Sequence, residues 1–444
     1  MDKGGGSVNP QDYYRQVFSR LENSFRRYDY FITTGNELVA EGCDPAFPAL
    51  ASPLDRLGHY TIERALQVHL PIIGERSDWV LMPIDFEIFL GDDNFRLYSD
   101  KDTQKTYFEA IMPVAEFIEQ MFRSRGMPYL LDYTPSGGHF LFQNQLGKRA
   151  TRELASIGYL EEDLIKACKY MDPNDLRRRH GVALDAARVF SGLGKLAEYI
   201  ALLTMDAFRN NTAEGKYPVT ISDSLDRCIN LDNTWTEGSP FMRSIRSPFS
   251  LHKKNQEKYG NYHQPSLVDV IGACFDGKNI EQENNLDVIL DCMWDLGKAA
   301  AHARRFTGDI PSSNDTLIDF IGEYKQSDLY AFHQDFDRDT DMPRGHALNA
   351  AKNEPNIPDW ARNILYFPNP KALQSKNLIG LVFDFCIRAN WKPKHIGNVL
   401  RDLYQDPAYG WTQDFFKDPA EEKANYWARV YSAVALWQTD RLKI

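Results

Sequence analysis

The pattern of apolar and polar positions divides the chain into a mixed α/β part and a helical end. Apolar residues at helical spacing predict an amphipathic helix over 13–28 and another over 107–125. The apolar run 79–90 predicts a buried strand. Residues 129–133 and 139–142, joined by a small-residue turn at 135–138, predict a strand–turn–strand unit.

The rest of the pattern continues this alternation and then changes. The apolar spacing is mainly helical over 151–209 and again over 284–306. The region between them is mixed and turn-rich over 218–254, with a short apolar element at 227–231. An acidic, polar stretch with one expected helix inside it follows residue 311, and from about 355 the spacing is amphipathic and rich in tryptophan. We therefore expect a flexible N-terminus (1–10), an α/β unit (11–310), a linker region (311–345) and an all-α C-terminal domain (346–444).

Charge and composition narrow the possible classes of protein. The 444 residues include 62 Asp and Glu against 51 Lys and Arg, a net charge of −11. This balance excludes a histone-like coat for nucleic acid, but a polyanion needs only one positive groove. No apolar run approaches the ~20 residues that span a bilayer, and the N-terminus lacks the apolar stretch of a signal peptide. We expect a soluble, intracellular protein without a membrane partner.

The six cysteines lie far apart in the sequence and form no C-x-x-C pair. Neither a disulfide framework nor a cysteine zinc knuckle is encoded, so no structural zinc is predicted. We expect these cysteines to be reduced and mostly buried.

Asp85 and Glu87 lie two residues apart within the predicted strand, so their side chains share one face. Two carboxylates in this arrangement can bind one hard divalent cation through oxygen. Chance D-x-E triplets occur in a chain this acidic. An acidic pair inside an apolar run, however, is costly to bury unless its charge is compensated.

The turn Ser136-Gly-Gly138-His139 enters the next predicted strand. Its two glycines allow the backbone to approach a ligand and present N–H groups to an anion, while Ser136 and His139 add donors for phosphate oxygens. The alternative is an ordinary hairpin turn with a structural histidine.

A basic segment covers 243–258 and contains five Lys and Arg against one acid, a charge of +4 before His252 is counted. Arg246 and Lys254 are suited to hold a triphosphate or a nucleic-acid strand, the arginine by paired hydrogen bonds and the lysine as a point charge. The alternative is a solvated loop. Three upstream acids, Asp223, Asp226 and Asp232, are candidates for a third metal-binding carboxylate.

Taken in order, these motifs resemble those of the archaeo-eukaryotic primase superfamily, in particular primase-polymerases of plasmid and phage type. The resemblance covers 85–254, and its most specific part is the run R-S-P-F-S-L-H-K-K from Arg246 to Lys254. It implies an α/β catalytic domain with an RRM-like antiparallel sheet and a second small β subdomain. It also implies catalytic, metal-binding carboxylates, which we assign to Asp85, Glu87 and Asp226. The implied nucleotide-binding residues are Ser136, Gly138, His139, Arg246, His252 and Lys254.

The implied activity is that of a DNA-dependent primase-polymerase, which makes or extends primers by two-metal nucleotidyl transfer with Mg²⁺ or Mn²⁺. The implied partners are a single-stranded DNA template, NTP or dNTP, and a replicative helicase or another replisome protein. The implied setting is the cytoplasm, at the nucleoid or a replicating plasmid or phage. Residues 390–404 are similar to helical domains appended to such primases, and 177–180 and 392–394 are further candidate contacts for nucleic acid.

Two other functions fit the same residues. Acids and a histidine on strands also suit a metal-dependent nuclease or phosphoesterase. A non-catalytic scaffold that binds nucleic acid during replication is the third possibility, and it would not need the three carboxylates.

Overall fold

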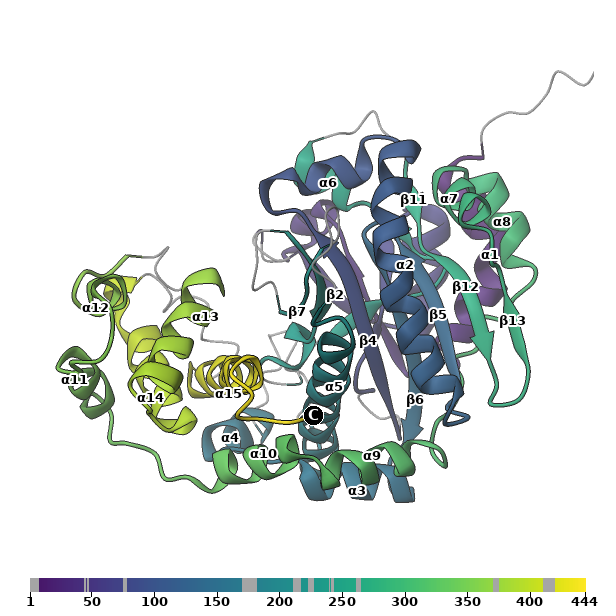
Figure 1. Ribbon diagram of the computed structural model, residues 1–444. Coiled ribbons are helices and arrows are strands. Elements are labelled where there is room, and N and C mark those ends of the chain that lie inside the picture. Colours follow the sequence, from purple (N-terminus) through teal and green to yellow (C-terminus); the bar gives the residue numbers. More distant parts are fainter. Residues whose placement is uncertain are drawn as a thin grey trace, which may run out of the picture.

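The computed structural model of the protein is shown in Figure 1. It describes residues 8–43, 45, 48–74, 78–169, 182–210, 217–222, 227–238, 240, 243–260, 265–369, 375–409 and 420–444. Most of the expected flexible N-terminus, residues 1–7, lies outside the described residues, as do the candidate contacts at 177–180.

A seven-stranded sheet forms the centre of the fold, with the strand order β13-β12-β5-β6-β4-β8-β7. Neighbouring strands are antiparallel except for β7 and β8, which are parallel. The strands are β4 (Trp79–Phe89), β5 (Tyr129–Thr134), β6 (Gly137–Gln145), β7 (Val219–Ile221), β8 (Cys228–Asp232), β12 (Val270–Phe275) and β13 (Ile280–Gln282). The predicted strand over 79–90 and the predicted strand–turn–strand unit are confirmed.

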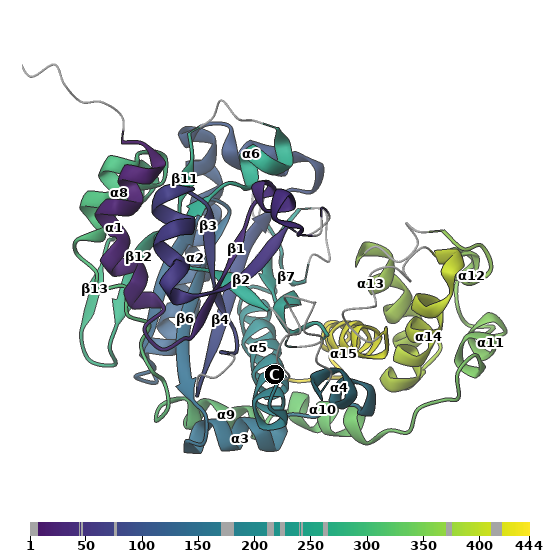
Figure 2. The same ribbon diagram turned by 180° about the vertical axis from the view of Figure 1, so that it is seen from behind.

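Two smaller antiparallel sheets complete the β structure. One has the order β2-β1-β3-β9 and the other pairs β10 with β11. Their strands are β1 (Tyr30–Thr34), β2 (Ala49–Pro53), β3 (Gln67–Pro71), β9 (Ser244–Arg246), β10 (Leu251–His252) and β11 (Leu267–Val268). Figure 2, which shows the molecule from behind, has β1 and β3 in front of the large sheet. The basic segment therefore enters the smaller sheets through β9 and β10.

The first 310 residues also contain eight α-helices among the described residues: α1 (Pro10–Ser24), α2 (Lys101–Arg123), α3 (Arg149–Ile157), α4 (Glu162–Lys169), α5 (Leu184–Ala207), α6 (Lys254–Tyr259), α7 (Leu286–Trp294) and α8 (Leu296–Ala303). The helices expected over 13–28, 107–125 and 284–306 are confirmed by α1, α2 and the pair α7–α8, and the stretch 151–209, expected to be mainly helical, contains α3, α4 and α5. The start of α1 is set by Asn9, whose side chain accepts the N–H of Asp12, and by Pro10 in the first turn.

The two faces of the large sheet differ in chemistry because successive side chains on a strand point to opposite sides. On one face, the ring of Phe122 from α2 lies 5.4 Å from that of Phe140 on β6, and the Phe140 ring lies 5.7 Å from that of Phe86 on β4. This apolar face is covered by α2 and α5, which lie in front of the sheet in Figure 1. Asp85 and Glu87 alternate with Phe86 and therefore point to the opposite face.

The chain ends in a group of helices: α9 (Leu317–Gln326), α10 (Asp328–Arg338), α11 (His346–Lys352), α12 (Asp359–Tyr366), α13 (Ser375–Phe383), α14 (Pro393–Gln405) and α15 (Ala420–Gln438). Helices α9 and α10 lie inside the expected linker 311–345 and pack against the α/β part. Helices α13 and α14 pack against α15, and α11 packs against α14 and α12 (Figure 1). A mixed α/β fold with antiparallel sheets and a helical C-terminal region is confirmed. The domain boundaries stay a prediction.

A buried charged contact joins α15 to the α/β part. The Glu198 carboxylate on α5 is 2% exposed and accepts hydrogen bonds from the Arg429 guanidinium on α15, with Nε 3.2 Å from Oε1. The same carboxylate lies 3.0 Å from Nε2 of His333 on α10. Burial alone would raise the pKa of Glu198, but Arg429 and His333 lower it to about 2. These three helices are therefore fixed to one another by a buried charge network.

Two further expectations concern membranes and cysteines. No helix of the described residues is long and apolar enough to cross a membrane. The six cysteines form no disulfide, and all but Cys274 are buried. The expectation that the cysteines are mostly buried is confirmed, and their reduced state stays a prediction.

Candidate active site

A row of ionisable residues crosses four adjacent strands of the large sheet. Asp85 on β4 is paired in register with His139 on β6 and with Asp232 on β8, and His139 is paired with Asp132 on β5. Residues directly opposite each other on antiparallel strands project from the same face. The order across the sheet is therefore Asp132, His139, Asp85, Asp232, all on the face away from α2.

Glu87 joins this row because it follows Asp85 by two positions and so shares its face. It is paired with Gly137 on one side and Asn230 on the other. Ser136 donates a hydrogen bond from Oγ to Oε2 of Glu87 at 3.3 Å. The serine of the predicted anion-binding turn therefore lies directly beside the second carboxylate.

The two glycines of this turn allow the strands to approach closely. A Cβ on Gly137 would lie 1.9 Å from the Phe86 carbonyl oxygen, and one on Gly138 would lie 2.7 Å from that of Asp132. Both obstructing atoms are backbone and cannot move aside without breaking the register of β4, β5 and β6. These residues are thus required by the sheet itself, whatever ligand the turn contacts.

Replacing Gly137 with Ala is expected to lower the free energy of unfolding by about 3 kcal/mol or more, because the new methyl group meets backbone. Gly322→Ala is the control, since a Cβ there meets nothing within 4 Å. That helical substitution is expected to stabilise by up to ~1 kcal/mol. Denaturant unfolding measures both, and a Gly137→Ala protein as stable as wild type would contradict the pairing of β4 with β6.

Crowding of the carboxylates changes their proton affinity. Burial, with repulsion from Asp232 and Glu87, raises the pKa of Asp85 to about 8, although His139 and Arg246 oppose the shift. Burial and the nearby Glu87 also raise the pKa of Asp232. Carboxylates that repel one another in this way gain most from a bound divalent cation, which neutralises them together.

His139 lies between two acids. Its Nδ1 lies 3.2 Å from Oδ1 of Asp132, and its Nε2 lies 3.8 Å from Oδ1 of Asp85. Burial alone would lower the pKa of His139, but Asp132 and Asp85 raise it to about 9. The imidazole that this environment favours is protonated and faces the carboxylate row.

The basic segment packs against the same face. Arg246 on β9 is paired with His69 of β3, and its Nη1 lies 3.4 Å from Oδ1 of Asp269, just before β12. The charge of Arg246 lowers the proton affinity of Asp85 across the gap between the sheets. Lys254 has the same effect on Asp232. The positive charges of the segment therefore act on the carboxylates from the other side.

His252 on β10 completes this side. It is 1% exposed, and within the described chain neither ring nitrogen has a hydrogen-bond partner. Burial, with the charges of Arg246 and Lys254, lowers its pKa well below the usual range, so the ring is neutral. Its ring centroid lies 5.5 Å from that of Tyr98. A neutral, unpartnered imidazole in this position is free to donate a hydrogen bond to an anion.

The structure thus brings eight of the nine residues expected at the site to one region: Asp85, Glu87, Ser136, Gly138, His139, Arg246, His252 and Lys254. The ninth, Asp226, lies outside the described residues, as does Asp223. The third alternative, Asp232, is described and is the direct neighbour of Asp85.

Sequence reasoning missed Asp132 and Asp269. Both are almost completely buried, at 0% and 1% exposure, in segments that are otherwise apolar. The signal was the one that identified Asp85, an acid inside an apolar run that is costly to bury without compensation. It was present in the runs Tyr-Leu-Leu-Asp132-Tyr and Leu-Val-Asp269-Val.

One expected nucleic-acid contact is different in the structure. Lys394 is 1% exposed and its Nζ pairs with the Glu161 carboxylate. This lysine was expected to face nucleic acid, and that expectation is wrong because its charge is used inside the protein. Lys392, by contrast, is 61% exposed and pairs with Asp339.

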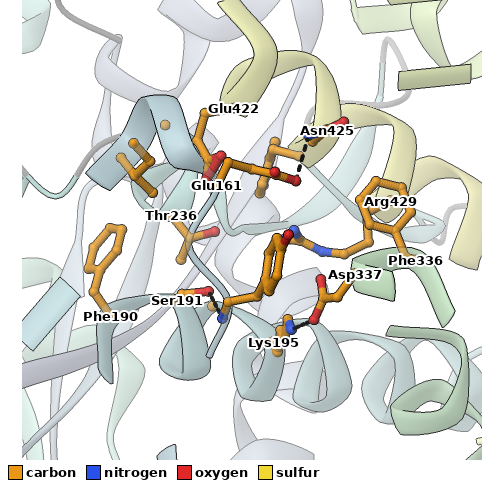
Figure 3. A pocket seen from close by; sticks show the side chains of 15 residues that line it. Glu161, Phe190, Ser191, Lys195, Thr236, Phe336, Asp337, Glu422, Asn425 and Arg429 are labelled. Atoms are coloured by element: carbon orange, nitrogen blue, oxygen red, sulfur yellow. Dashed lines mark hydrogen bonds and ion pairs between the residues drawn. The ribbon is translucent and has the colours of Figure 1, made fainter. Parts of the chain in front are cut away.

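A separate pocket of about 40 Å³ lies where α15 meets α5 and α10 (Figure 3). Lys195 pairs with Asp337 and Asn425 donates to Glu161, as the dashed lines in Figure 3 mark. The volume holds on the order of three water molecules. We regard it as a hydrated seam between the helices and not as the site of chemistry.

Glu422 lines this seam, and replacing it with Gln is expected to raise the melting temperature at pH 8. Burial, with repulsion from Glu161, raises the pKa of Glu422 to about 8 from an ordinary value of 4.5. The native state therefore binds the extra proton between these values, and stability falls as pH rises through that window. The glutamine variant does not lose stability in this way, so the difference in melting temperature between the two proteins should shrink toward pH 5. Melting curves from pH 5 to 8 that coincide for both proteins would contradict this.

Comparisons of the chain with protein families, with curated proteins and with solved structures found no match. Function is therefore inferred from the site itself.

Proposed function

We propose that the protein is a template-directed nucleotidyl transferase of the archaeo-eukaryotic primase-polymerase type. The observation that carries the proposal is the position of Asp85, between His139 and Asp232 in register and beside Glu87, with the basic segment packed against the same face. A large, mainly antiparallel sheet with a smaller sheet beside it also agrees with the α/β catalytic domain that the sequence resemblance implies.

The three carboxylates fit divalent metal ions by their chemistry. Asp85, Glu87 and Asp232 offer hard oxygen donors, and the Asp85 side chain is 20% exposed, so ions can enter from solvent. Mg²⁺ or Mn²⁺ bound there would lower the pKa of an attacking 3′-hydroxyl and balance the charge of the departing pyrophosphate. The raised pKa of Asp85 means that binding would release a proton at neutral pH.

The remaining residues would bind the triphosphate. Ser136 lies beside Glu87, and His139 faces Asp85 with a ring that favours the protonated state. On the opposite side, Arg246 and Lys254 would offset the phosphate charge, and the neutral His252 would donate a hydrogen bond to a phosphate oxygen. The site would thus place ligands for cations and donors for phosphates close together, as nucleotidyl transfer requires.

For the third carboxylate we now favour Asp232, because it is the strand neighbour of Asp85. The original assignment to Asp226 stays a prediction. Matched Asp232→Asn and Asp226→Asn proteins separate the two: the metal ligand loses nucleotide incorporation by orders of magnitude, while the other retains it. If both variants keep wild-type activity, neither aspartate is the third metal ligand.

The C-terminal helices contact the strands next to this site. Tyr426 on α15 shares a 3.0 Å hydrogen bond with Ser222 at the end of β7, and Trp427 donates to Glu237 beyond β8 at 2.7 Å. This contact supports a role for the helical domain in positioning template or nucleotide beside Asp232.

The experiment that tests the function is an incorporation assay on single-stranded DNA with labelled NTP or dNTP and with Mg²⁺ or Mn²⁺. We expect metal-dependent products longer than any supplied primer. A parallel incubation of labelled DNA with metal and no nucleotide identifies a nuclease by shortening of the DNA. DNA binding without either activity would indicate the scaffold.

A further inference from the structure

A second group of possible metal ligands lies behind the carboxylate row. Asp132 on β5, His139 on β6 and Asp269 before β12 are 0%, 4% and 1% exposed. Each offers one donor atom, and the three atoms lie within 4.8 Å of one another. In the part of the chain that the structure describes, the carboxylates of Asp85, Glu87 and Asp232 do not form so close a group.

The donor atoms of this cluster have no hydrogen-bond partners within the described chain. Both carboxylate oxygens of Asp132, Oδ2 of Asp269 and Nδ1 of His139 are buried and have no hydrogen-bond partner. Nδ1 of His139 lies 3.2 Å from Oδ1 of Asp132, but the two atoms are not aligned for a hydrogen bond. Burying polar atoms without partners costs several kcal/mol, and native proteins usually satisfy them by protein, water or an ion. One donor atom from each of the three residues lies within 4.8 Å of the other two, and this convergence indicates that a ligand belongs there.

The atoms that face away from this point are supported. Arg246 lies 3.4 Å from Oδ1 of Asp269, leaving Oδ2 directed to the cluster, and Nε2 of His139 faces Asp85. Metal-binding carboxylates and histidines are commonly held in this manner, by partners on the atom that does not bind the ion. The two carboxylates carry two negative charges, which a divalent cation would balance completely. A proton on His139 balances only one of them.

We propose that Asp132, His139 and Asp269 bind a first-row divalent transition-metal ion, separate from any ion at Asp85, Glu87 and Asp232. One imidazole nitrogen and two carboxylate oxygens suit Zn²⁺ or Mn²⁺ better than Mg²⁺, which prefers oxygen alone. The ion fixes the His139 ring through Nδ1, so that Nε2–H points at Asp85. The metal site does not depend on the proposed function. Only the idea that the ion orients His139 toward a triphosphate depends on that function.

The test is metal content and melting temperature of the full-length protein, without nucleotide or template. The chelator-treated protein is dialysed against Zn²⁺ or Mn²⁺ and analysed for bound metal. Asp132→Asn and Asp269→Asn remove ligands of the proposed site with no change in side-chain shape. Glu87→Gln/Asp232→Asn is the matched control, because it removes two carboxylates of the other group.

We expect the control to retain about one ion per chain and wild type to retain at least one, and both to melt at higher temperature with metal than without it. Asp132→Asn and Asp269→Asn should each retain about one ion fewer than wild type and lose most of the metal-dependent rise in melting temperature, while keeping a native circular dichroism spectrum. If one variant fails to fold, the other decides. The proposal is wrong if wild type retains no ion, or if both variants bind as wild type does. Neither result bears on nucleotidyl transfer, which this assay does not measure.

Discussion

Replacing Asp85 with Asn is expected to abolish metal-dependent nucleotide incorporation without unfolding the protein. Asp85 is the central carboxylate of the row, with Asp232 and His139 as its strand neighbours. Loss of its charge would remove a ligand of the proposed metal ions, which would contribute several kcal/mol to the stabilisation of a phosphoryl-transfer transition state. A loss of about 4 kcal/mol corresponds to a rate about a thousandfold lower.

The same substitution should leave the melting temperature of the metal-free protein unchanged or higher. Because burial and its acidic neighbours raise the pKa of Asp85 to about 8, the charged form is disfavoured in the native state, and an amide avoids that cost. Asp92→Asn, an exposed acid seven residues further along the chain, is the control and should keep full activity. Incorporation assays and melting curves on the three proteins measure both effects. A fully active Asp85→Asn protein would overturn the assignment.

The second large effect is expected at the junction of α5 and α15. Replacing Glu198 with Ala leaves the Arg429 guanidinium, 16% exposed, without its carboxylate partner. Breaking one side of a buried pair typically costs about 3–5 kcal/mol, most of it from the charge that is left buried. The loss of stability should be largest where the C-terminal helices contact the α/β part.

The control for this effect is the half-exposed pair Arg125–Glu323, with side chains 25% and 42% exposed. Solvent screening limits such a pair, so Glu323→Ala should cost less than about 1 kcal/mol. Replacing both Glu198 and Arg429 by apolar residues should restore part of the stability, because no unpaired charge remains. Denaturant unfolding together with limited proteolysis of the C-terminal region measures these differences. Equal losses in Glu198→Ala and Glu323→Ala would show that the junction does not depend on this pair.

Much of the fold was predictable because its signals are local. The apolar run around Asp85 and the glycine turn before His139 define β4, β5 and β6 without distant information. In the expected linker the sequence predicted one helix, whereas the structure has two, α9 and α10, because acidic composition hid apolar residues at helical spacing, such as Phe320 and Tyr324, which are buried. Composition alone was a poor guide there.

The site was less predictable because it depends on strand register. Whether Asp226 or Asp232 meets Asp85 is decided by which residue of β8 pairs with β4, and no local pattern encodes that pairing. The same applies to Lys394, whose partner Glu161 is 233 positions away. Asp132 and Asp269 had the right local signal, yet only the fold shows that both approach His139.

The most direct test of the central claim is whether the template dictates the product. The wild-type protein is incubated with Mn²⁺ or Mg²⁺ on single-stranded homopolymer templates, each with all four labelled nucleotides supplied one at a time. The account predicts that only the nucleotide complementary to each template is incorporated, and that Asp85→Asn incorporates none. Incorporation independent of the template, or degradation of the template with no incorporation under any of these conditions, would contradict it.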